Sequence, residues 1–131
     1  MYELTVKSRF AAAHQLRNYK GKCENLHGHN WKIEITLQTD RLDEVGLGID
    51  FGEIRSMLNE ILEELDHCCL NDLPAFREEN PSSELIARWI FNEAARRMEK
   101  DHILVSRVTA WESDDACATY FAGDITTPPR S

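Results

Sequence analysis

Hydrophobic and polar residues alternate along two stretches in the first third of the chain, residues 2–10 and 31–38. Nearly every second side chain in them is apolar, and a period of two is typical of a strand with one buried face. The segment between them, residues 17–22, is polar and contains Gly21, which indicates a loop. We therefore predict that the two strands are neighbours in a hairpin.

Two later segments follow the helical period instead. Asp50 precedes apolar residues spaced three and four apart, and Glu53 stands at the position of a capping box, so a helix is predicted to begin at Asp50. A second helix is predicted to begin with Asn80 as its N-cap and Pro81 in its first turn, and to reach about Met98.

Two further strands are predicted at residues 103–111 and 116–121, joined by the polar turn at residues 113–115. The order strand-strand-helix-helix-strand-strand predicts an α+β fold, in which both helices cover one face of an antiparallel sheet. The length of 131 residues suits a single domain. We assign that domain to residues 1–122 and expect residues 123–131 to form a flexible tail.

Composition and charge narrow the possible functions. Apolar residues make up 42% and charged residues 29%, as in an ordered globular protein. The chain has no apolar run long enough to cross a bilayer and no secretory signal, so we expect a cytoplasmic protein without a membrane partner. A net charge of −8 argues against nucleic acid as a partner. We expect the four cysteines to be free thiols, and Cys68, Cys69 and Cys117 to fill the core.

Three of the five histidines lie where the first hairpin closes: His14 past the first strand, and His27 and His29 before the second. Residues two apart in an extended chain point to the same side, about 6.5 to 7 Å apart, so both imidazoles can bind one ion. His14 can add a third ligand. Three imidazoles favour Zn²⁺ with an open fourth position, as in catalytic sites. Alternatively, each ring is a core histidine held by one hydrogen bond.

Candidate acid–base residues accompany the histidines. Cys23 is a fourth metal ligand, a separate acid–base group beside an open zinc site, or an ordinary buried cysteine, and we favour the second of these interpretations. Asp66 and His67 could complete a proton-transfer set with a cysteine, or His67 could only interact with a helix dipole. Glu112 ends an inward-facing row. It is either a surface residue or an anchor for a ligand with paired N–H donors.

Taken together, these residues resemble the 6-pyruvoyltetrahydropterin synthase/6-carboxytetrahydropterin synthase family, along nearly the whole chain. The motifs that carry the resemblance are Phe10-Ala-Ala-Ala-His14, Cys23-x-x-x-His27-Gly-His29, Leu65-Asp-His-x-x-Leu-Asn71, Glu79-Asn-Pro-Ser-Ser-Glu84 and Trp111-Glu112.

The resemblance implies the tunnelling fold, in which β-β-α-α-β-β protomers join their sheets into a barrel with active sites at subunit boundaries. A homo-oligomer is therefore expected, either a hexamer built as a dimer of trimers or a tetramer. The site residues that it implies are the zinc ligands His14, His27 and His29, the proton-transfer residues Cys23, Asp66 and His67, and the pterin contacts Glu112, Ser82 and Ser83.

The implied activity is zinc-dependent conversion of 7,8-dihydroneopterin triphosphate to 6-carboxy-5,6,7,8-tetrahydropterin, with release of acetaldehyde and triphosphate, for queuosine biosynthesis. The three-residue gap between Cys23 and His27 is similar to that of the bacterial 6-carboxytetrahydropterin branch. Glu24 stands where related enzymes that cleave the side chain to a hydroxymethylpterin for folate use a glutamate base. It is either such a base or a solvated loop acid.

Other functions stay open at this point. Formation of 6-pyruvoyltetrahydropterin is one alternative, and a zinc hydrolase or a non-catalytic ligand-binding module are more remote ones. The triphosphate of an anionic substrate could meet a group of loop cations, or these could be solvated. They are Arg17, Lys20 and Lys22.

Overall fold

The structure is a computed structural model that describes residues 1–22 and 24–123. Cys23 and residues 124–131 lie outside the described residues, and so does nearly all of the predicted tail. Neither helix of the described part is long and apolar enough to cross a membrane.

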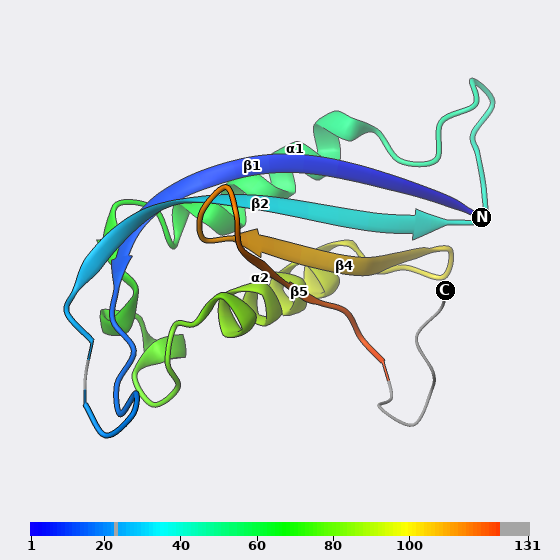
Figure 1. Ribbon diagram of the computed structural model, residues 1–131. Helices are drawn as coiled ribbons and strands as arrows, with labels where there is room; N and C mark the ends of the chain where they lie inside the picture. The colour runs from blue at the N-terminus through cyan, green and yellow to red at the C-terminus, as the bar shows by residue number, and fades with distance from the viewer. Residues whose placement is uncertain (23, 124–131) are drawn as a thin grey trace.

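Five strands form one sheet, in the order β3-β1-β2-β4-β5 (Figure 1). They are β1 (Tyr2–His14), β2 (His27–Thr39), β3 (Cys68–Cys69), β4 (Ile103–Trp111) and β5 (Cys117–Tyr120). The four predicted strands pair antiparallel, as expected. The sequence analysis missed β3, which pairs parallel to β1, because two residues are too few to reveal a period.

Strands β1 and β2 are longer than predicted, 13 residues each, and they pair along their whole length. Residues 11–13 are all alanine, so hydrophobicity does not alternate there although burial does, with Ala12 the most buried of the three. His14 is therefore the last residue of β1 and His27 the first of β2. The sequence analysis had placed both residues outside the strands, which was wrong.

Two helices, α1 (Phe51–Glu63) and α2 (Ser83–Met98), cover one face of the sheet (Figure 1). Asp50 is the N-cap of α1, as predicted, and its carboxylate accepts a hydrogen bond from the backbone N–H of Gly52. Two short 3₁₀ helices, Leu70–Asp72 and Pro74–Phe76, lead from β3 towards α2.

The predicted start of α2 was wrong. Ser82 is the N-cap, and its hydroxyl accepts from the backbone N–H of Leu85 at 3.2 Å. The Asn80 side chain instead bonds both backbone groups of Arg17, at 2.8 and 3.0 Å. A capping residue and a residue that ties two loops together look alike in sequence, because both are short polar side chains.

The core lies between the helices and the covered face of the sheet. The central strand β2 contributes Trp31, Ile33, Ile35 and Leu37, all with no exposed surface. Ile54 and Leu58 of α1 and Ile86 and Ile90 of α2 pack on the same cluster. The opposite face of the sheet is polar: it carries Lys32 of β2 and, on β1, Lys7 and Arg9.

The cysteines differ from the prediction in one case. Cys68 and Cys69 are half-buried, and Cys68 packs against the core. Cys117 is exposed on β5 and does not fill the core, because it alternates with the more buried Ala118 on a strand at the edge of the sheet.

Candidate metal centre and active site

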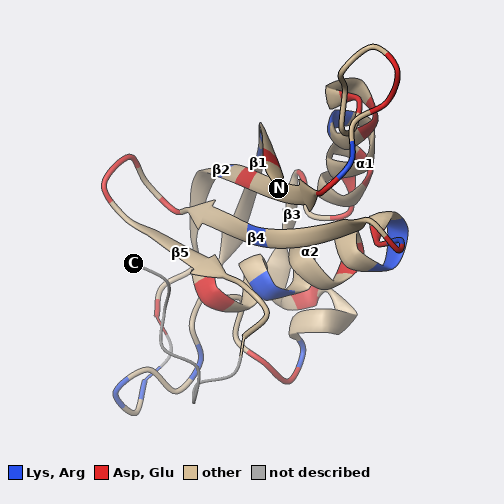
Figure 2. Cartoon of the chain, turned by 90° about the vertical axis from the view of Figure 1, so that its right-hand side faces the viewer, with Lys and Arg blue, Asp and Glu red and all other residues tan. Residues whose placement is uncertain are grey.

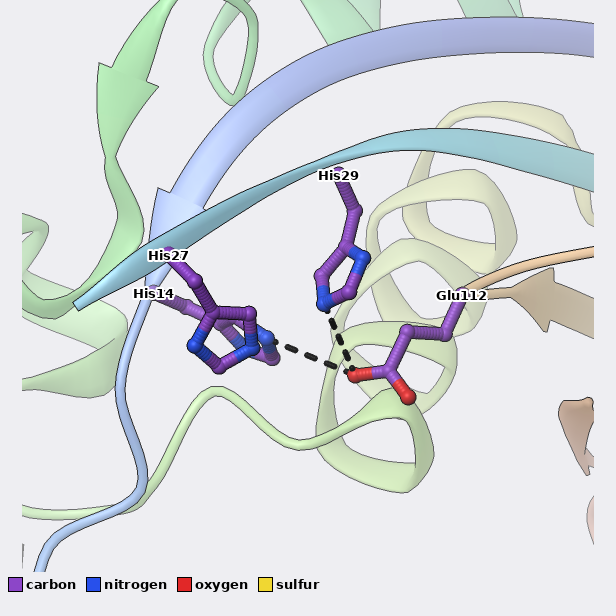
Figure 3. Close-up of side chains that lie close together, drawn as sticks. All are labelled: His14, His27, His29 and Glu112. Carbon is purple, nitrogen blue, oxygen red and sulfur yellow. Dashed lines mark ion pairs between the residues drawn. The ribbon is translucent and has the colours of Figure 1, made fainter. Parts of the chain in front are cut away.

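Three histidines and one glutamate converge at one end of the sheet (Figure 3). His14 is directly opposite His27 in the register of β1 and β2, and His29 follows on the same side of β2. The three ring centroids lie 4.7 to 5.1 Å apart. Glu112, the residue after β4, points at the rings, and each of the four residues offers one ligand atom within 4.8 Å of the others.

Backbone carbonyls fix which ring nitrogen carries the proton in two of the imidazoles. His14 Nδ1 lies 2.8 Å from the carbonyl of Pro81, and His27 Nδ1 lies 2.8 Å from that of Asn25. A carbonyl only accepts, so Nδ1 must donate, and in the neutral form of each ring Nε2 then carries the lone pair. The same arrangement orients histidines that bind metals.

The nitrogens at the centre of the cluster are left without hydrogen-bond partners. The Nε2 atoms of His14 and His29 are buried and accept or donate no hydrogen bond to any described residue. Each lies 3.4 Å from Glu112 Oε1, which is close enough for an ion pair but does not satisfy hydrogen-bond geometry (Figure 3). An unpartnered buried polar group costs about 1–3 kcal/mol. A cation bound among these atoms would remove that cost.

The charge state of His29 agrees with a ligand role. Burial lowers the pKa of its imidazole; the Glu112 carboxylate opposes that shift, and the neighbouring rings of His14 and His27 add to it. The neutral, lone-pair form is therefore favoured at neutral pH, and that is the form that binds a metal. The residues fit a zinc ion held by three imidazoles.

Glu112 is more than a residue at a hairpin end. Its side chain is 36% exposed, yet its carboxylate faces His14 and His29. The inward row of β4 predicted this direction, but the sequence analysis did not place Glu112 among possible metal ligands. The signal was weak because 83 positions separate Glu112 from His29, and only the pairing of β2 with β4 brings the two residues together.

Asp66 and His67 form a second cluster at the outer edge of β1. Asp66 Oδ2 lies 2.7 Å from His67 Nδ1, and its Oδ1 accepts from the backbone N–H of Ala11 at 2.9 Å. The Ala11 N–H and His67 hold the pKa of Asp66 below its ordinary value. The His67 side chain is 82% exposed and its φ is 56°.

This pair lies outside the group of metal-ligand atoms in the single chain. His67 instead lines a shallow depression of about 570 Å³, whose wall includes His29, Gly28 and Cys69. The structure therefore joins Asp66 to His67 but does not bring the pair into the histidine cluster, and the proton-transfer role of the pair stays a prediction.

The family is settled by comparison with known proteins. The family model described as 6-pyruvoyl tetrahydropterin synthase matches residues 3–123. The chain belongs to this family.

Relatives of this chain carry a more specific name. A 6-carboxy-5,6,7,8-tetrahydropterin synthase from Synechocystis is 36% identical over 127 residues, which is 93% of this chain and 95% of the relative. A protein of the same name from Haemophilus influenzae is 27% identical and covers 92% of this chain and 99% of its own length.

Solved structures confirm the predicted fold class. The 6-pyruvoyl tetrahydropterin synthase of Caenorhabditis elegans superposes with a TM-score of 0.80 at 24% identity, covering 93% of this chain and 96% of that protein. The Plasmodium falciparum protein of the same name gives a TM-score of 0.75 at 21% identity. The tunnelling fold expected from the sequence motifs of this family is therefore the fold of this chain.

The remaining predicted site residues lie on the loop before β2 and at the start of α2. Cys23 lies outside the described residues, and its role stays a prediction. Glu24 is not a freely solvated acid: its carboxylate accepts from the backbone N–H of Leu16 at 3.1 Å, and its charge raises the pKa of His29 slightly against the effect of burial.

The hydroxyl of Ser82 caps α2 by accepting a hydrogen bond from the backbone N–H of Leu85, and Ser83 is the first residue of that helix. Arg17 is tied to the fold, because its guanidinium donates to the carbonyls of Phe76 and Glu79. Lys20 and Lys22 are exposed in the loop between β1 and β2, where Figure 2 shows blue segments. A phosphate contact by any of these three cations stays a prediction.

Proposed function

We propose that this protein is a zinc-dependent 6-carboxy-5,6,7,8-tetrahydropterin synthase of queuosine biosynthesis. Its substrate would be 7,8-dihydroneopterin triphosphate, and its products the 6-carboxy pterin, acetaldehyde and triphosphate. The histidine cluster carries this proposal, because two buried Nε2 atoms face a common centre without a hydrogen-bond partner among the described residues. The names of the Synechocystis and Haemophilus relatives support it.

His14, His27 and His29 would hold the metal. The carbonyls of Pro81 and Asn25 keep two of these rings in the orientation that presents Nε2, so these ligand atoms would already be oriented when an ion binds. A bound zinc ion supplies Lewis-acid chemistry, which lowers the pKa of substrate hydroxyls and stabilises negative charge at neutral pH.

Glu112 would orient the substrate. A carboxylate with two oxygens can accept two parallel N–H bonds from the edge of a pterin ring. Because this carboxylate approaches His14 and His29 to 3.4 Å, a ring anchored on it keeps its side chain beside the metal ligands. Ser82 or Ser83 would add a further contact to the ring from the start of α2.

Cys23 would remove a proton from the substrate side chain as a thiolate, and the Asp66–His67 pair would return one on the other side. The exposure of His67 at the β1 edge supports a pair that serves the histidine cluster of a neighbouring subunit. The active protein would then be a homo-oligomer, a hexamer or a tetramer.

The edges of the sheet support such an assembly. In the described chain β1 pairs with β3 only at Ala12 and Ala13, so the rest of its outer edge has no strand partner, and β5 forms the other edge. Unpaired edges are templates for pairing with another chain. Sheets joined in this way would close into the barrel expected for the family.

A second candidate activity depends on Glu24. Its carboxylate is fixed on the loop that leads into β2, close enough for its charge to affect the pKa of His29. A glutamate base at this point would cleave the side chain to a hydroxymethylpterin. Formation of a 6-pyruvoyl product is the further alternative, since the solved C. elegans protein bears that name.

The cellular setting that we propose is the cytoplasm, with a small-molecule pterin substrate and neither nucleic acid nor membrane as a partner. The net charge of −8 supports the absence of a broad contact with nucleic acid.

Product analysis tests the proposed function. Zinc-loaded protein incubated with 7,8-dihydroneopterin triphosphate should give the 6-carboxy pterin by mass spectrometry and an equal amount of acetaldehyde. The His27→Ala protein, treated identically, is the control and should give neither. A 6-pyruvoyl or hydroxymethyl product from the zinc-loaded protein would contradict the proposal.

A further inference from the structure

The backbone just past β1 is held by side chains and not by a neighbouring strand. The pairing of β1 with β2 ends at His14 and His27, so residues 15–17 lie beyond the sheet. Half-buried backbone N–H and C=O groups still need hydrogen-bond partners. All three residues are half-buried, and both backbone groups of each one are bonded. Figure 1 shows this loop beside the segments that lead from β3 to α2.

Two asparagines supply most of these bonds. Asn71 Oδ1 accepts from the N–H of Gln15 and its Nδ2 donates to the carbonyl of the same residue, both at 2.9 Å. Asn80 binds the N–H and the carbonyl of Arg17 in the same way, at 2.8 and 3.0 Å. A carboxamide carries an acceptor beside a donor, as the backbone of a partner strand does. Each asparagine therefore takes the place of a strand partner.

Between the two asparagines, the loop is bonded to itself through a predicted acid–base residue. Glu24 Oε1 accepts from the N–H of Leu16 at 3.1 Å, and the N–H of Glu24 donates to the carbonyl of Leu16 at 2.9 Å. Glu24 stands three positions before the predicted metal ligand His27. The place of its carboxylate therefore depends on the backbone of Leu16, which the asparagines hold on both sides.

Asn80 also connects the loop to a predicted metal ligand. The next residue, Pro81, is buried, and its carbonyl accepts from Nδ1 of His14 at 2.8 Å. The Asn80 side chain binds the chain again at Arg17, three residues after His14. Loss of the Asn80 side chain should therefore disturb the orientation of His14 as well as the loop.

Asn71 connects the loop to the Asp66–His67 pair. The segment from this pair to Asn71 runs beside the end of β1: the N–H of His67 donates to the carbonyl of Ala11, β3 pairs with the next two residues, and Asn71 adds the last contact, at Gln15. Loss of the Asn71 side chain should affect the loop without touching the carbonyl that orients the metal ligand.

We propose that Asn71 and Asn80 are positioning residues, which fix the loop between β1 and β2 so that its acid–base residues meet the substrate at the metal centre. Neither side chain takes part in the chemistry, and each acts through the backbone that it binds. The inference rests on the proposed function, because it gives both residues a part in that reaction. Placement matters to such a site, since a displacement of about 1 Å can cost about 10² in rate.

Hydrogen exchange resolved to single amides tests the contacts without substrate. The N–H of Gln15 should exchange at least about tenfold faster in Asn71→Ala than in wild type, and that of Arg17 should do so in Asn80→Ala, because each loses its acceptor. The matched control is Asn92→Ala, which removes an exposed carboxamide from α2 and should keep both rates within about twofold. Unchanged rates in Asn71→Ala and Asn80→Ala would overturn the proposal.

Zinc affinity separates the two asparagines. Asn80→Ala should bind zinc about tenfold more weakly or worse, since changes to groups that orient metal ligands typically cost about 10–100-fold. Asn71→Ala should stay within about twofold of wild type. Competition with a chromophoric chelator measures both constants. Unchanged affinity in Asn80→Ala would overturn its link to His14, and equal weakening in both variants would overturn the separate roles.

Steady-state kinetics distinguish positioning from a purely structural role. Asn71→Asp has the same shape and keeps the acceptor for the N–H of Gln15, but it loses the donor. Its kcat should fall about tenfold and that of Asn71→Ala about 10²-fold, with KM within about threefold of wild type. Both are measured at a temperature at which circular dichroism shows folded protein. A normal kcat per folded chain in Asn71→Ala would overturn the proposal.

Failure of this proposal can be told from failure of the proposed function. If wild type forms a different pterin product, the proposed function fails, while the exchange rates and zinc affinities still decide whether the asparagines hold the loop and His14. If wild type forms the 6-carboxy pterin and Asn71→Ala forms it with an unchanged kcat, the positioning role fails and the function stands.

Discussion

The histidine cluster and the Asp66–His67 pair differ in how far a single chain completes them. His14 is 2% exposed, and its neighbours fix the proton on Nδ1 so that Nε2 faces the cluster without a hydrogen-bond partner among the described residues. His67 is 82% exposed, and its Nδ1 is already paired with Asp66. The first region is assembled within one chain, whereas the second faces outward.

This difference follows from where each region is held. The cluster sits on paired strands, whose register fixes the side chains to a common side. The pair sits on a turn after α1, with Asp66 bonded to the backbone of Ala11 at the sheet edge. Side chains that are ordered but exposed at an edge are well placed to complete a site on another subunit.

The largest expected effect comes from breaking the cluster. Purified wild type should carry about one zinc per chain, and His27→Ala should lose most of it together with activity, since two imidazoles rarely hold the ion. Elemental analysis by mass spectrometry measures the metal. His102→Ala, at the other end of β4, is the control and should keep it. Full zinc in His27→Ala would show that the cluster is not the metal site.

The next test separates the two regions. His67→Ala should keep its zinc and lose turnover by roughly 10²–10⁴, the usual contribution of an acid–base group. If the pair serves a neighbouring subunit, mixed oligomers assembled from His67→Ala and His27→Ala chains should regain measurable activity, because some sites then combine two intact halves. Mixtures that stay as inactive as either variant alone would place the whole site within one chain.

A comparison of Cys23→Ala with Glu24→Gln asks which acid–base group belongs beside the cluster. Cys23→Ala should keep zinc and lose turnover by roughly 10²–10⁴, whereas Glu24→Gln should keep most acetaldehyde formation. Loss of zinc in Cys23→Ala would make the thiol a ligand. If Glu24 is a second base, a hydroxymethylpterin should form in the wild type and in Cys23→Ala but not in Glu24→Gln.

The smallest effect concerns pH and the exposed pair. The N–H of Ala11 and His67 hold the pKa of Asp66 below its ordinary value, so the folded state is stabilised at pH above about 4. That contribution is lost as pH falls through the lowered pKa. Asp66→Asn should therefore unfold at a slightly lower temperature than wild type at pH 7, and the difference should vanish in acid. A difference that is constant with pH would show that the charge of Asp66 plays no part.

Local patterns predicted most of the fold. Alternation revealed β1, β2, β4 and β5, and the helical period with Asp50 revealed the start of α1. These patterns failed at two places. Asn80 was predicted to cap α2, but its side chain bonds the backbone of Arg17. The three alanines before His14 show no alternation of hydrophobicity, so the end of β1 was predicted too early. These errors moved element ends by a few residues, and the one strand of the described sheet that the patterns missed is the two-residue β3.

The sequence by itself determined which residues could bind a metal, because ligand identity and the spacing of His27 and His29 on a strand are local properties. Only the tertiary structure decided that Glu112 joins the cluster, that Ser82 caps a helix and that the Asp66–His67 pair faces outward. Those facts depend on the pairing of β2 with β4 and on the turn after α1. Contacts between residues distant in sequence are fixed by the packing of the whole sheet, which no local pattern encodes.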